Sequence, residues 1–224
     1  MSDDAEVEDR NTEATGPHDG QPIETAGAPP QVAEAAVVML HGRGDSPRHF
    51  LRLADEFHHR GVRYLAPEAA GRAWYPGPVE DDREEKEPWL SSAFRLVDET
   101  LTVAADAGVP PERTVFVGFS QGASLAAEFV TSHPRRYGGL AVLAGSLFGP
   151  DAGETVHEGS LDGTPVFLGC GADDPHVSSE RVRGSAATFR RLDAEVTDRV
   201  YDDLDHVIND DEIGEIDRLV GGIA

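Results

Sequence analysis

Short apolar runs alternate with amphipathic stretches along most of the chain. Residues 35–40 (Ala-Ala-Val-Val-Met-Leu) are apolar at every position, which is typical of a strand buried on both faces. Ser46-Pro47 then offers a helix N-cap and a first helical residue, and an apolar helical stripe continues to Gly61. The same alternation predicts strands at residues 62–66, 114–117, 140–143, 166–168 and 196–201, and helices at 91–107, 122–132, 180–192 and 210–220.

This alternation determines the expected fold class. Strands that alternate with helices, with turn signals between them, predict an α/β fold with a mostly parallel, doubly wound sheet and helices on both faces. The length of 224 residues fits one domain.

Residues 68–90 form a long connection, and connections of that length are usually functional or disordered. Its acidic run, residues 80–87, is expected to be a solvated loop.

Residues 1–32 differ from the rest of the chain in composition. They carry many acidic residues and scattered proline and glycine, but almost no aliphatic side chains. Such a segment buries too little apolar surface to offset the entropy lost on ordering. We therefore predict a disordered tail over residues 1–32 and a folded α/β domain over residues 33–224.

The charge of the chain is strongly acidic. Asp and Glu number 42 against 19 Lys and Arg, the net charge is −23, and Lys86 is the only lysine. This charge repels phosphate backbones and argues against a nucleic-acid partner. Strong acidity with almost no lysine is typical of proteins from a salt-saturated cytoplasm, where salt screens the repulsion between carboxylates. A GC-rich genome would explain arginine in place of lysine, but not the charge, so we expect a halophilic protein.

The sequence also bears on the cellular compartment. No run approaches eighteen apolar residues, so we expect no membrane span. Residues 2–8 are acidic, whereas a secretory signal would be basic and then apolar. The single cysteine, Cys170, excludes an internal disulfide framework and suits a reducing interior. Together these features predict a cytoplasmic protein, and they leave its oligomeric state open.

A Gly-x-Ser-x-Gly string, Gly118-Phe119-Ser120-Gln121-Gly122, lies between a predicted strand and a predicted helix. A serine on such a sharp strand-to-helix turn needs small residues on either side, and the two glycines supply that room. The start of the following helix also directs positive potential at the turn. The context therefore favours Ser120 as a nucleophile over an ordinary glycine-rich turn.

A serine nucleophile needs a base and an acid, which follow it in the order Asp, then His in this type of site. His206 lies just after the last predicted strand, where a loop emerges at the strand's carboxyl end. Asp173 and Asp174 directly follow the strand at 166–168, and both qualify by position. The other histidines beyond Ser120, which are less suitable by position, are His133, His157 and His176.

An oxyanion hole requires two backbone N–H groups. One would come from Gln121, the residue after the nucleophile, and the other most plausibly from Arg43 in the loop His41–Asp45. That loop could instead cradle a phosphate, but no Gly-Lys-Ser/Thr follows it. We interpret Asp45 as structural, as a loop bond or a helix cap.

Four aromatic residues are candidates for an acyl pocket, with a core position as the alternative: Trp74, Tyr75, Trp89 and Phe148. His58-His59 and the group Asp173, Asp174 and His176 could be imagined as metal ligands. Adjacent histidines do not share a helical face, however, and we predict no metal and no cofactor.

These motifs, in this order, resemble the phospholipase/carboxylesterase family of small α/β-hydrolases, to which acyl-protein thioesterases also belong. The resemblance covers about residues 35–220, and residues 73–76 through 87–92 are similar to a prokaryotic esterase subgroup. Arg43, in place of an apolar residue, and Asp205, in place of a glycine, depart from the family pattern. The resemblance implies an α/β-hydrolase fold without a large cap domain and selects Asp174, which precedes Pro175, over Asp173.

The expected function is that of a serine carboxylesterase acting on small-molecule esters with short- to medium-chain acyl groups. Ser120 would attack the carbonyl, His206 would transfer the proton, and Asp174 would fix the tautomer of His206. The alternatives are an acyl thioesterase or lysophospholipase of the same family. A catalytically silent binding protein with this fold is a third possibility.

Overall fold

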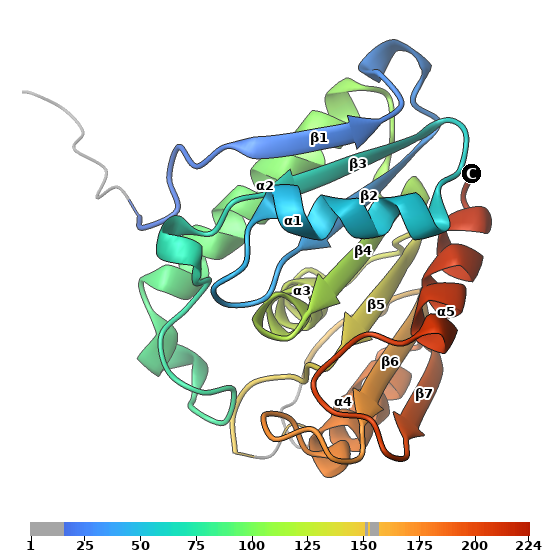
Figure 1. Cartoon of the computed structure of the whole chain (residues 1–224). Helices are drawn as coiled ribbons and strands as arrows, with labels where there is room; N and C mark the ends of the chain where they lie inside the picture. Colours follow the sequence, from blue (N-terminus) through green and yellow to red (C-terminus); the bar gives the residue numbers. More distant parts are fainter. Residues whose placement is uncertain (1–15, 151, 153–156) are drawn as a thin grey trace, which may run out of the picture.

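The computed structural model describes residues 16–150, 152 and 157–224, and these form an α/β-hydrolase-type fold (Figure 1). The strands are β1 (Ile23–Gly27), β2 (Ala35–Leu40), β3 (Val62–Pro67), β4 (Thr114–Phe119), β5 (Gly139–Leu143), β6 (Pro165–Gly171) and β7 (Glu195–Tyr201). The α-helices are α1 (Pro47–Phe50), α2 (Trp89–Asp106), α3 (Gln121–Ser132), α4 (Ser179–Arg191) and α5 (Asp210–Gly221). The predicted alternation of strand and helix is therefore confirmed.

All the strands belong to one sheet in the order β1-β3-β2-β4-β5-β6-β7. Every neighbouring pair is parallel except β1 and β3, which are antiparallel. The predicted mostly parallel, doubly wound sheet is thus confirmed, with one antiparallel strand added at its edge.

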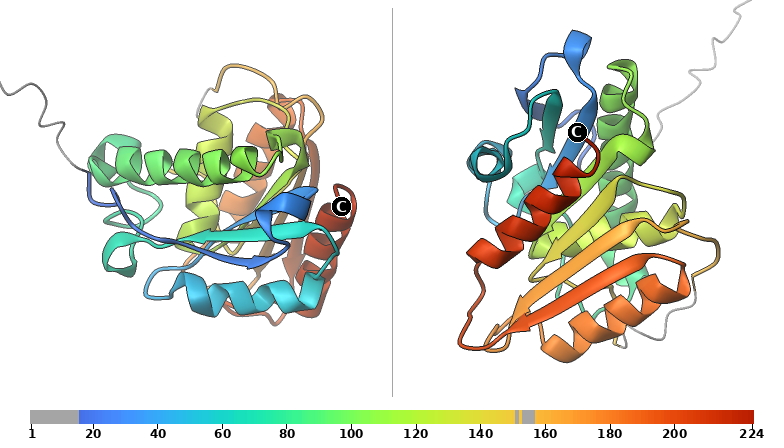
Figure 2. Two further views of the ribbon diagram at one scale, coloured as in Figure 1. Left: turned by 90° about the horizontal axis from the view of Figure 1, so that it is seen from above. Right: turned by 90° about the vertical axis from the view of Figure 1, so that its right-hand side faces the viewer.

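Helices cover both faces of the sheet, and the alternation of side chains along β2 shows how. Val37 and Met39 pack in a cluster with residues of α1 and α5, whereas Val38 and Leu40 pack in a cluster with residues of α2, α3 and α4. Successive side chains of a strand point to opposite faces, so an apolar run is what a sheet covered on both sides requires. Figure 2 shows α1 and α2 on opposite sides of the sheet.

The first predicted helix is only partly α-helical. Ser46 caps it through a hydrogen bond from the His49 N–H, and Pro47 is its first residue, as expected. After Phe50, however, the chain tightens into a 3₁₀ helix, η2 (Leu51–Phe57). Asp45 accepts hydrogen bonds from the Ser46 N–H and from the His49 ring, so its interpretation as a structural residue is confirmed.

The predicted domain boundary at residue 32 is wrong. Residues 23–27 form β1, and His18 is fully buried, so residues 16–32 belong to the folded domain. The part of the predicted tail before residue 16 lies outside the described residues. The composition was misleading because β1 is held by backbone pairing with β3 and only Ile23 is even half-buried.

The parallel sheet brings several loops to one edge. The carboxyl ends of β2, β4 and β6 lead directly to His41, Ser120 and Ala172, and β7 leads to the loop that carries His206. In doubly wound sheets, sites lie outside this edge. The fold therefore gathers the loop after β2, Ser120, the Asp173-Asp174 pair and His206 on one side of the molecule.

Candidate active site

Ser120 lies on a tight turn between β4 and α3. Its φ is 53° and its ψ is −118°, a conformation that L residues rarely adopt. A Cβ at Gly122 would overlap the Leu40 carbonyl oxygen, and one at Gly118 would overlap the Gly122 carbonyl oxygen. Only glycine fits at either position, so the two glycines of the motif are required for the strained turn that presents Ser120.

A hydrogen-bonded series links three of the predicted site residues. His206 Nε2 lies 2.9 Å from Ser120 Oγ, and His206 Nδ1 lies 2.7 Å from Asp174 Oδ2. An ionised carboxylate only accepts hydrogen bonds, so Nδ1 carries the ring proton and Nε2 accepts from the Ser120 hydroxyl. The Asp174 side chain is fully buried and that of His206 is 18% exposed. This arrangement can take a proton from the hydroxyl and stabilise the imidazolium that results.

The two adjacent aspartates have different positions. Asp174 Oδ1 accepts hydrogen bonds from the backbone N–H groups of His176 (2.8 Å) and Val177 (3.0 Å), which leaves Oδ2 for His206. Asp173 is exposed, and its backbone N–H is bound to the Leu204 carbonyl. The structure therefore brings Asp174, not Asp173, to His206.

The loop that carries His206 is anchored by the start of α5. Asn209 caps this helix by accepting from the Glu212 N–H, while the Glu212 carboxylate accepts from the Asn209 N–H, both at 2.9 Å. Such a reciprocal capping box fixes the direction in which the chain enters the helix. Glu212 is only 1% exposed, and burial raises the pKa of its carboxyl to about 7.

We expect Glu212→Gln to stabilise the protein at alkaline pH. Between pH 4.5, the ordinary pKa of this carboxyl, and about pH 7, the folded chain keeps a proton that the unfolded chain loses. Stability attributable to Glu212 therefore falls as pH rises through this window, whereas glutamine keeps the acceptor without ionising. The free energy of unfolding at pH 8 should rise on the order of 2 kcal/mol, with little change at pH 4.5.

Denaturant titrations at both pH values would measure this effect. Glu99→Gln, on the exposed face of α2, is the matched control and should alter stability equally at the two pH values. If the Glu212→Gln and parent stabilities ran parallel between these two pH values, ionisation of Glu212 would not limit stability.

Both predicted oxyanion-hole residues line the same cleft as Ser120, and their side chains contact a neighbouring loop. Gln121 is the first residue of α3, where backbone N–H groups have no partner within the helix. Its side-chain oxygen accepts from the backbone N–H of Trp74, and its side-chain nitrogen donates to the backbone carbonyl of Tyr75, both at 2.8 Å. Arg43 donates to the Tyr75 carbonyl (3.0 Å) and the Gly77 carbonyl (2.9 Å). The two side chains thus hold the loop at residues 74–77 against the site.

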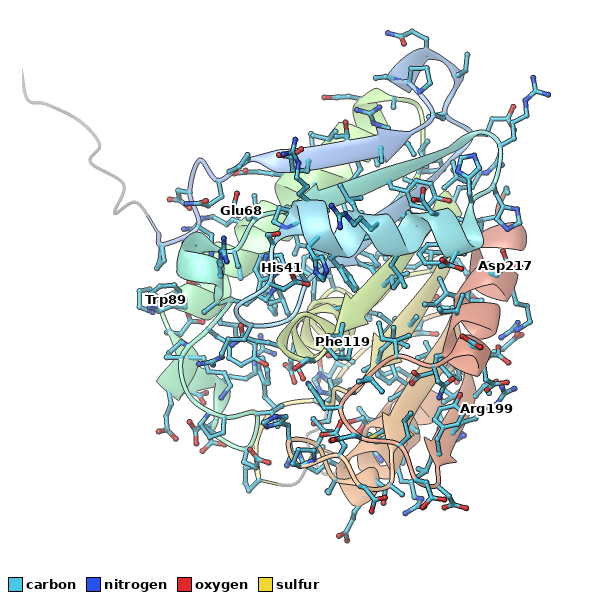
Figure 3. All side chains as sticks on the ribbon, in the orientation of Figure 1. His41, Glu68, Trp89, Phe119, Arg199 and Asp217 are labelled. Atoms are coloured by element: carbon cyan, nitrogen blue, oxygen red, sulfur yellow. The ribbon has the colours of Figure 1, made fainter. Side chains whose placement is uncertain are left out.

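Two buried histidines support the same loop from behind. Ala69 N–H donates to His41 Nε2 (3.2 Å), and Ala70 N–H donates to His18 Nδ1 (3.0 Å). Both rings lie near Trp74, with centroids 5.1 Å away for His41 and 5.6 Å for His18. A ring nitrogen that accepts must be unprotonated, and burial lowers the pKa of both histidines accordingly. In Figure 3, His41 and Phe119 mark the carboxyl ends of the neighbouring strands β2 and β4.

A cleft of about 420 Å³ opens beside Ser120 and His206. Its walls include Tyr75, residues 77–80, Ser124 and Val177. The cleft is therefore part apolar and part polar, and it is bounded by the long connection between β3 and α2.

The predicted aromatic lining of this cleft is corrected to Tyr75 alone. Phe148 packs behind Tyr75, with ring centroids 4.7 Å apart, and Trp74 is fully buried with its indole N–H bound to the His41 carbonyl. Trp89 is half-buried on α2, with its ring 5.5 Å from that of His18. None of these three lines the cleft.

Lys86 is fully buried, although its acidic surroundings in sequence predict a solvated loop. Its ammonium group donates to the carbonyls of Pro78 (2.7 Å) and Asp81 (3.0 Å), and it lies 4.9 Å from the centre of the Phe148 ring. Burial lowers the pKa of this amine. The one signal in the sequence that could have indicated its burial is that it is the only lysine in the chain. The only lysine therefore fixes the cleft wall at residues 78–81.

Other features concern metals and membranes. Among residues 16–150, 152 and 157–224, no group of three or more His, Cys, Asp or Glu side chains is arranged to hold a metal ion. His59 instead forms a hydrogen bond with Asp217 at 2.8 Å. Within the same ranges, no helix combines the length and apolar character needed to cross a bilayer.

Sequence comparison identifies the family. Residues 22–220 match the model of the phospholipase/carboxylesterase family, which is most of the chain. The chain belongs to this family. Curated relatives include acyl-protein thioesterase 1 of Kluyveromyces lactis, 28% identical over 66% of this chain and 72% of that protein. Another is esterase YpfH of Escherichia coli, 24% identical over 81% of this chain and 80% of that protein.

Solved structures with the same fold agree. A phospholipase/carboxylesterase from Dyadobacter fermentans has a TM-score of 0.84 and 35% identity, over 89% of this chain and 96% of that one. A Bacillus cereus carboxylesterase has a TM-score of 0.74 and 18% identity, over 92% of this chain and 96% of that one, and shows the shared fold. As a member of the phospholipase/carboxylesterase family, the chain belongs among esterases and thioesterases.

Proposed function

We propose that the chain is a serine carboxylesterase that hydrolyses esters of short- to medium-chain carboxylic acids. The observation that carries this proposal is the unbroken hydrogen-bonded series from Asp174 through His206 to Ser120 at the mouth of the cleft. Membership of a family that includes named esterases supports it. The chemistry needs no cofactor, because the three side chains supply nucleophile, base and acid.

In the proposed mechanism, Ser120 Oγ bonds to the carbonyl carbon while its proton passes to His206 Nε2. Asp174 stabilises the imidazolium, and the backbone N–H groups of Arg43 and Gln121 donate to the oxyanion. The imidazolium then gives its proton to the departing alkoxide, which leaves as the alcohol. Water attacks the acyl-serine by the same route, releasing the carboxylic acid and restoring the serine.

A chain-length series of p-nitrophenyl esters tests the acyl preference. The cleft has a volume of about 420 Å³, and Phe148 packs behind Tyr75 in its wall, so kcat/KM should peak at short to medium acyl chains and fall for long ones. A steady rise up to palmitate would contradict the assignment. Failure to react with a fluorophosphonate, together with no hydrolysis of any ester, would favour a silent binding protein instead.

Thioester hydrolysis is a second candidate function, favoured by the similarity to acyl-protein thioesterases. The acyl-enzyme step is the same for both substrate classes, so the family's chemistry permits either. Comparing kcat/KM for an ester and a thioester of the same acid separates the two, and we expect the ester to be preferred.

We further propose that the chain works in a cytoplasm of high salt. The support is its net charge of −23 and its single lysine. Self-repulsion at this charge destabilises the fold in dilute buffer, and it weakens as the Debye length shrinks to about 3 Å at 1 M salt.

The midpoint of thermal unfolding should therefore rise steadily in KCl between about 0.05 M and 2 M, with activity rising in parallel. Sucrose at matched osmolality is the control, because it favours burial without screening charge. Equal midpoints at both ends of the salt series would refute the halophilic assignment.

A further inference from the structure

A second cavity, of about 480 Å³, meets the first at His206. His206 lines both cavities, whereas Ser120 and Gln121 line only the first. The loop after β2 divides in the same way, because Arg43 lines the first cavity and Asp45 lines the second. The base of the proposed mechanism is therefore shared by the two cavities, while the nucleophile belongs to one.

The walls of the second cavity are largely apolar. They come from Phe50 of α1, Leu53 of η2, Phe119 of β4, and Val207 and Ile208 beyond His206. The Phe119 ring stands 4.9 Å from the ring of His206, so the apolar surface begins directly beside the base.

Val207 is unusually exposed for an apolar side chain. It is 52% exposed, and among the residues that the structure describes only Val32 is a comparably exposed large hydrophobic, at 60%. Isolated exposed hydrophobics are normal, but Val207 continues an apolar surface that adjoins a reactive imidazole. The charged lining residues, by contrast, are half-buried (Asp45) or exposed (Arg52 and Glu56), so charge lies toward solvent.

The proposed reaction determines which part of a substrate meets this surface. When the tetrahedral intermediate breaks down, His206 Nε2 donates its proton to the oxygen of the departing alcohol, which must lie within hydrogen-bond reach of that nitrogen. The carbonyl carbon is then bonded to Ser120 and its oxygen faces the backbone N–H groups of Arg43 and Gln121, all on the side of the first cavity. The substituent on the alcohol oxygen is thus the part directed past His206.

We propose that the second cavity binds the alcohol part of the ester and selects for a bulky apolar alcohol, such as an arylalkyl one. This inference rests on the proposed esterase function and deepens it by assigning the leaving-group side. Its volume, about 480 Å³, lies within the range of sites that enclose small molecules. A methyl ester would leave this cavity empty, whereas a benzyl ester would cover Phe119, Leu53 and Val207.

The test compares methyl and benzyl esters of one acid, whose alcohols differ little in acidity. We expect kcat/KM to be at least about tenfold higher for the benzyl ester. Val207→Ser and Leu53→Ala should each reduce this benzyl-to-methyl ratio by about threefold or more. Val32→Ser is the matched control, since it replaces a comparably exposed valine away from both cavities, and should leave the ratio unchanged.

A second readout separates alcohol binding from damage to His206. The alcohol has already left when the acyl-enzyme is hydrolysed, so the rate of that step should be the same in Val207→Ser as in the parent. Loss of that step in both variants would indicate a disturbed base and overturn the proposal. So would equal kcat/KM for the two esters, or a ratio that neither variant changes. Failure of the proposed function is distinct, because then no ester of either alcohol would be hydrolysed.

Discussion

Ester hydrolysis by Ser120→Ala is expected to fall by about three or more orders of magnitude in kcat. Ser120 Oγ is the only hydroxyl within 2.9 Å of the His206 ring among the hydrogen bonds of the described residues, so no neighbouring group can replace the nucleophile. The variant should still fold, because alanine lacks only the hydroxyl oxygen and its Cβ meets the same backbone strain at this positive φ as that of serine.

Active-site labelling provides the matching observation. The parent should form one covalent adduct with a fluorophosphonate, and Ser120→Ala should form none. Ser91→Ala, an exposed serine on α2, is the control and should keep both the adduct and full activity. Substantial turnover by Ser120→Ala with the adduct retained would mean that another residue is the nucleophile.

Replacing Asp174 by asparagine should be almost as damaging, with a loss of up to about 10⁴ in kcat. The carbonyl oxygen of the new amide can still accept from the N–H groups of His176 and Val177, which places the amide NH₂ against His206 Nδ1. Because the amide is a donor, Nδ1 must accept, and the ring proton moves to Nε2. The protonated Nε2 faces the Ser120 hydroxyl and cannot accept the hydroxyl proton. The substitution therefore preserves the shape of the side chain at position 174 but stabilises the inactive tautomer of His206.

Asp173→Asn is the natural control for this prediction. Its side chain is exposed and only its backbone N–H is engaged, with Leu204, so kcat should fall about tenfold or less. Measuring kcat for the two variants side by side, with circular dichroism to verify folding, decides between the adjacent carboxylates. If Asp173→Asn were the inactive variant, the acid of the mechanism would be wrongly assigned.

The sequence predicts the part of the site that depends on local backbone chemistry. Ser120 is recognisable because a strained turn demands glycine at positions 118 and 122, and this demand appears in the sequence itself. The apolar run of β2 likewise predicts a strand covered on both faces, as observed. Asp174 and Asp173 are not separable by position alone, because which carboxylate turns inward depends on the bonds that residues 176 and 177 make to it.

Features that depend on the three-dimensional path of the chain were not predictable. Trp74 is removed from the cleft because His18 and His41 enclose it, and His18 lies in a segment whose composition gives no sign of folding. Lys86 is buried because the carbonyls of Pro78 and Asp81 satisfy its charge, a partnership that no periodicity reveals. For Lys86 the partners are backbone groups, and backbone groups are the same at every position of a sequence.

The antiparallel strand β1 also bears on how the molecule avoids self-association. It pairs with β3 along all five of its residues, from Ile23 to Gly27, and so moves the edge of the sheet from the largely buried β3 to a short, mostly exposed strand. The opposite edge, β7, is protected differently, by the charged side chains of Asp198 and Arg199 and their ion pairs. A chain that began at residue 33 would lack β1 and would present β3 as a template for a second copy. Such a truncation would favour edge-to-edge aggregation (Figure 1).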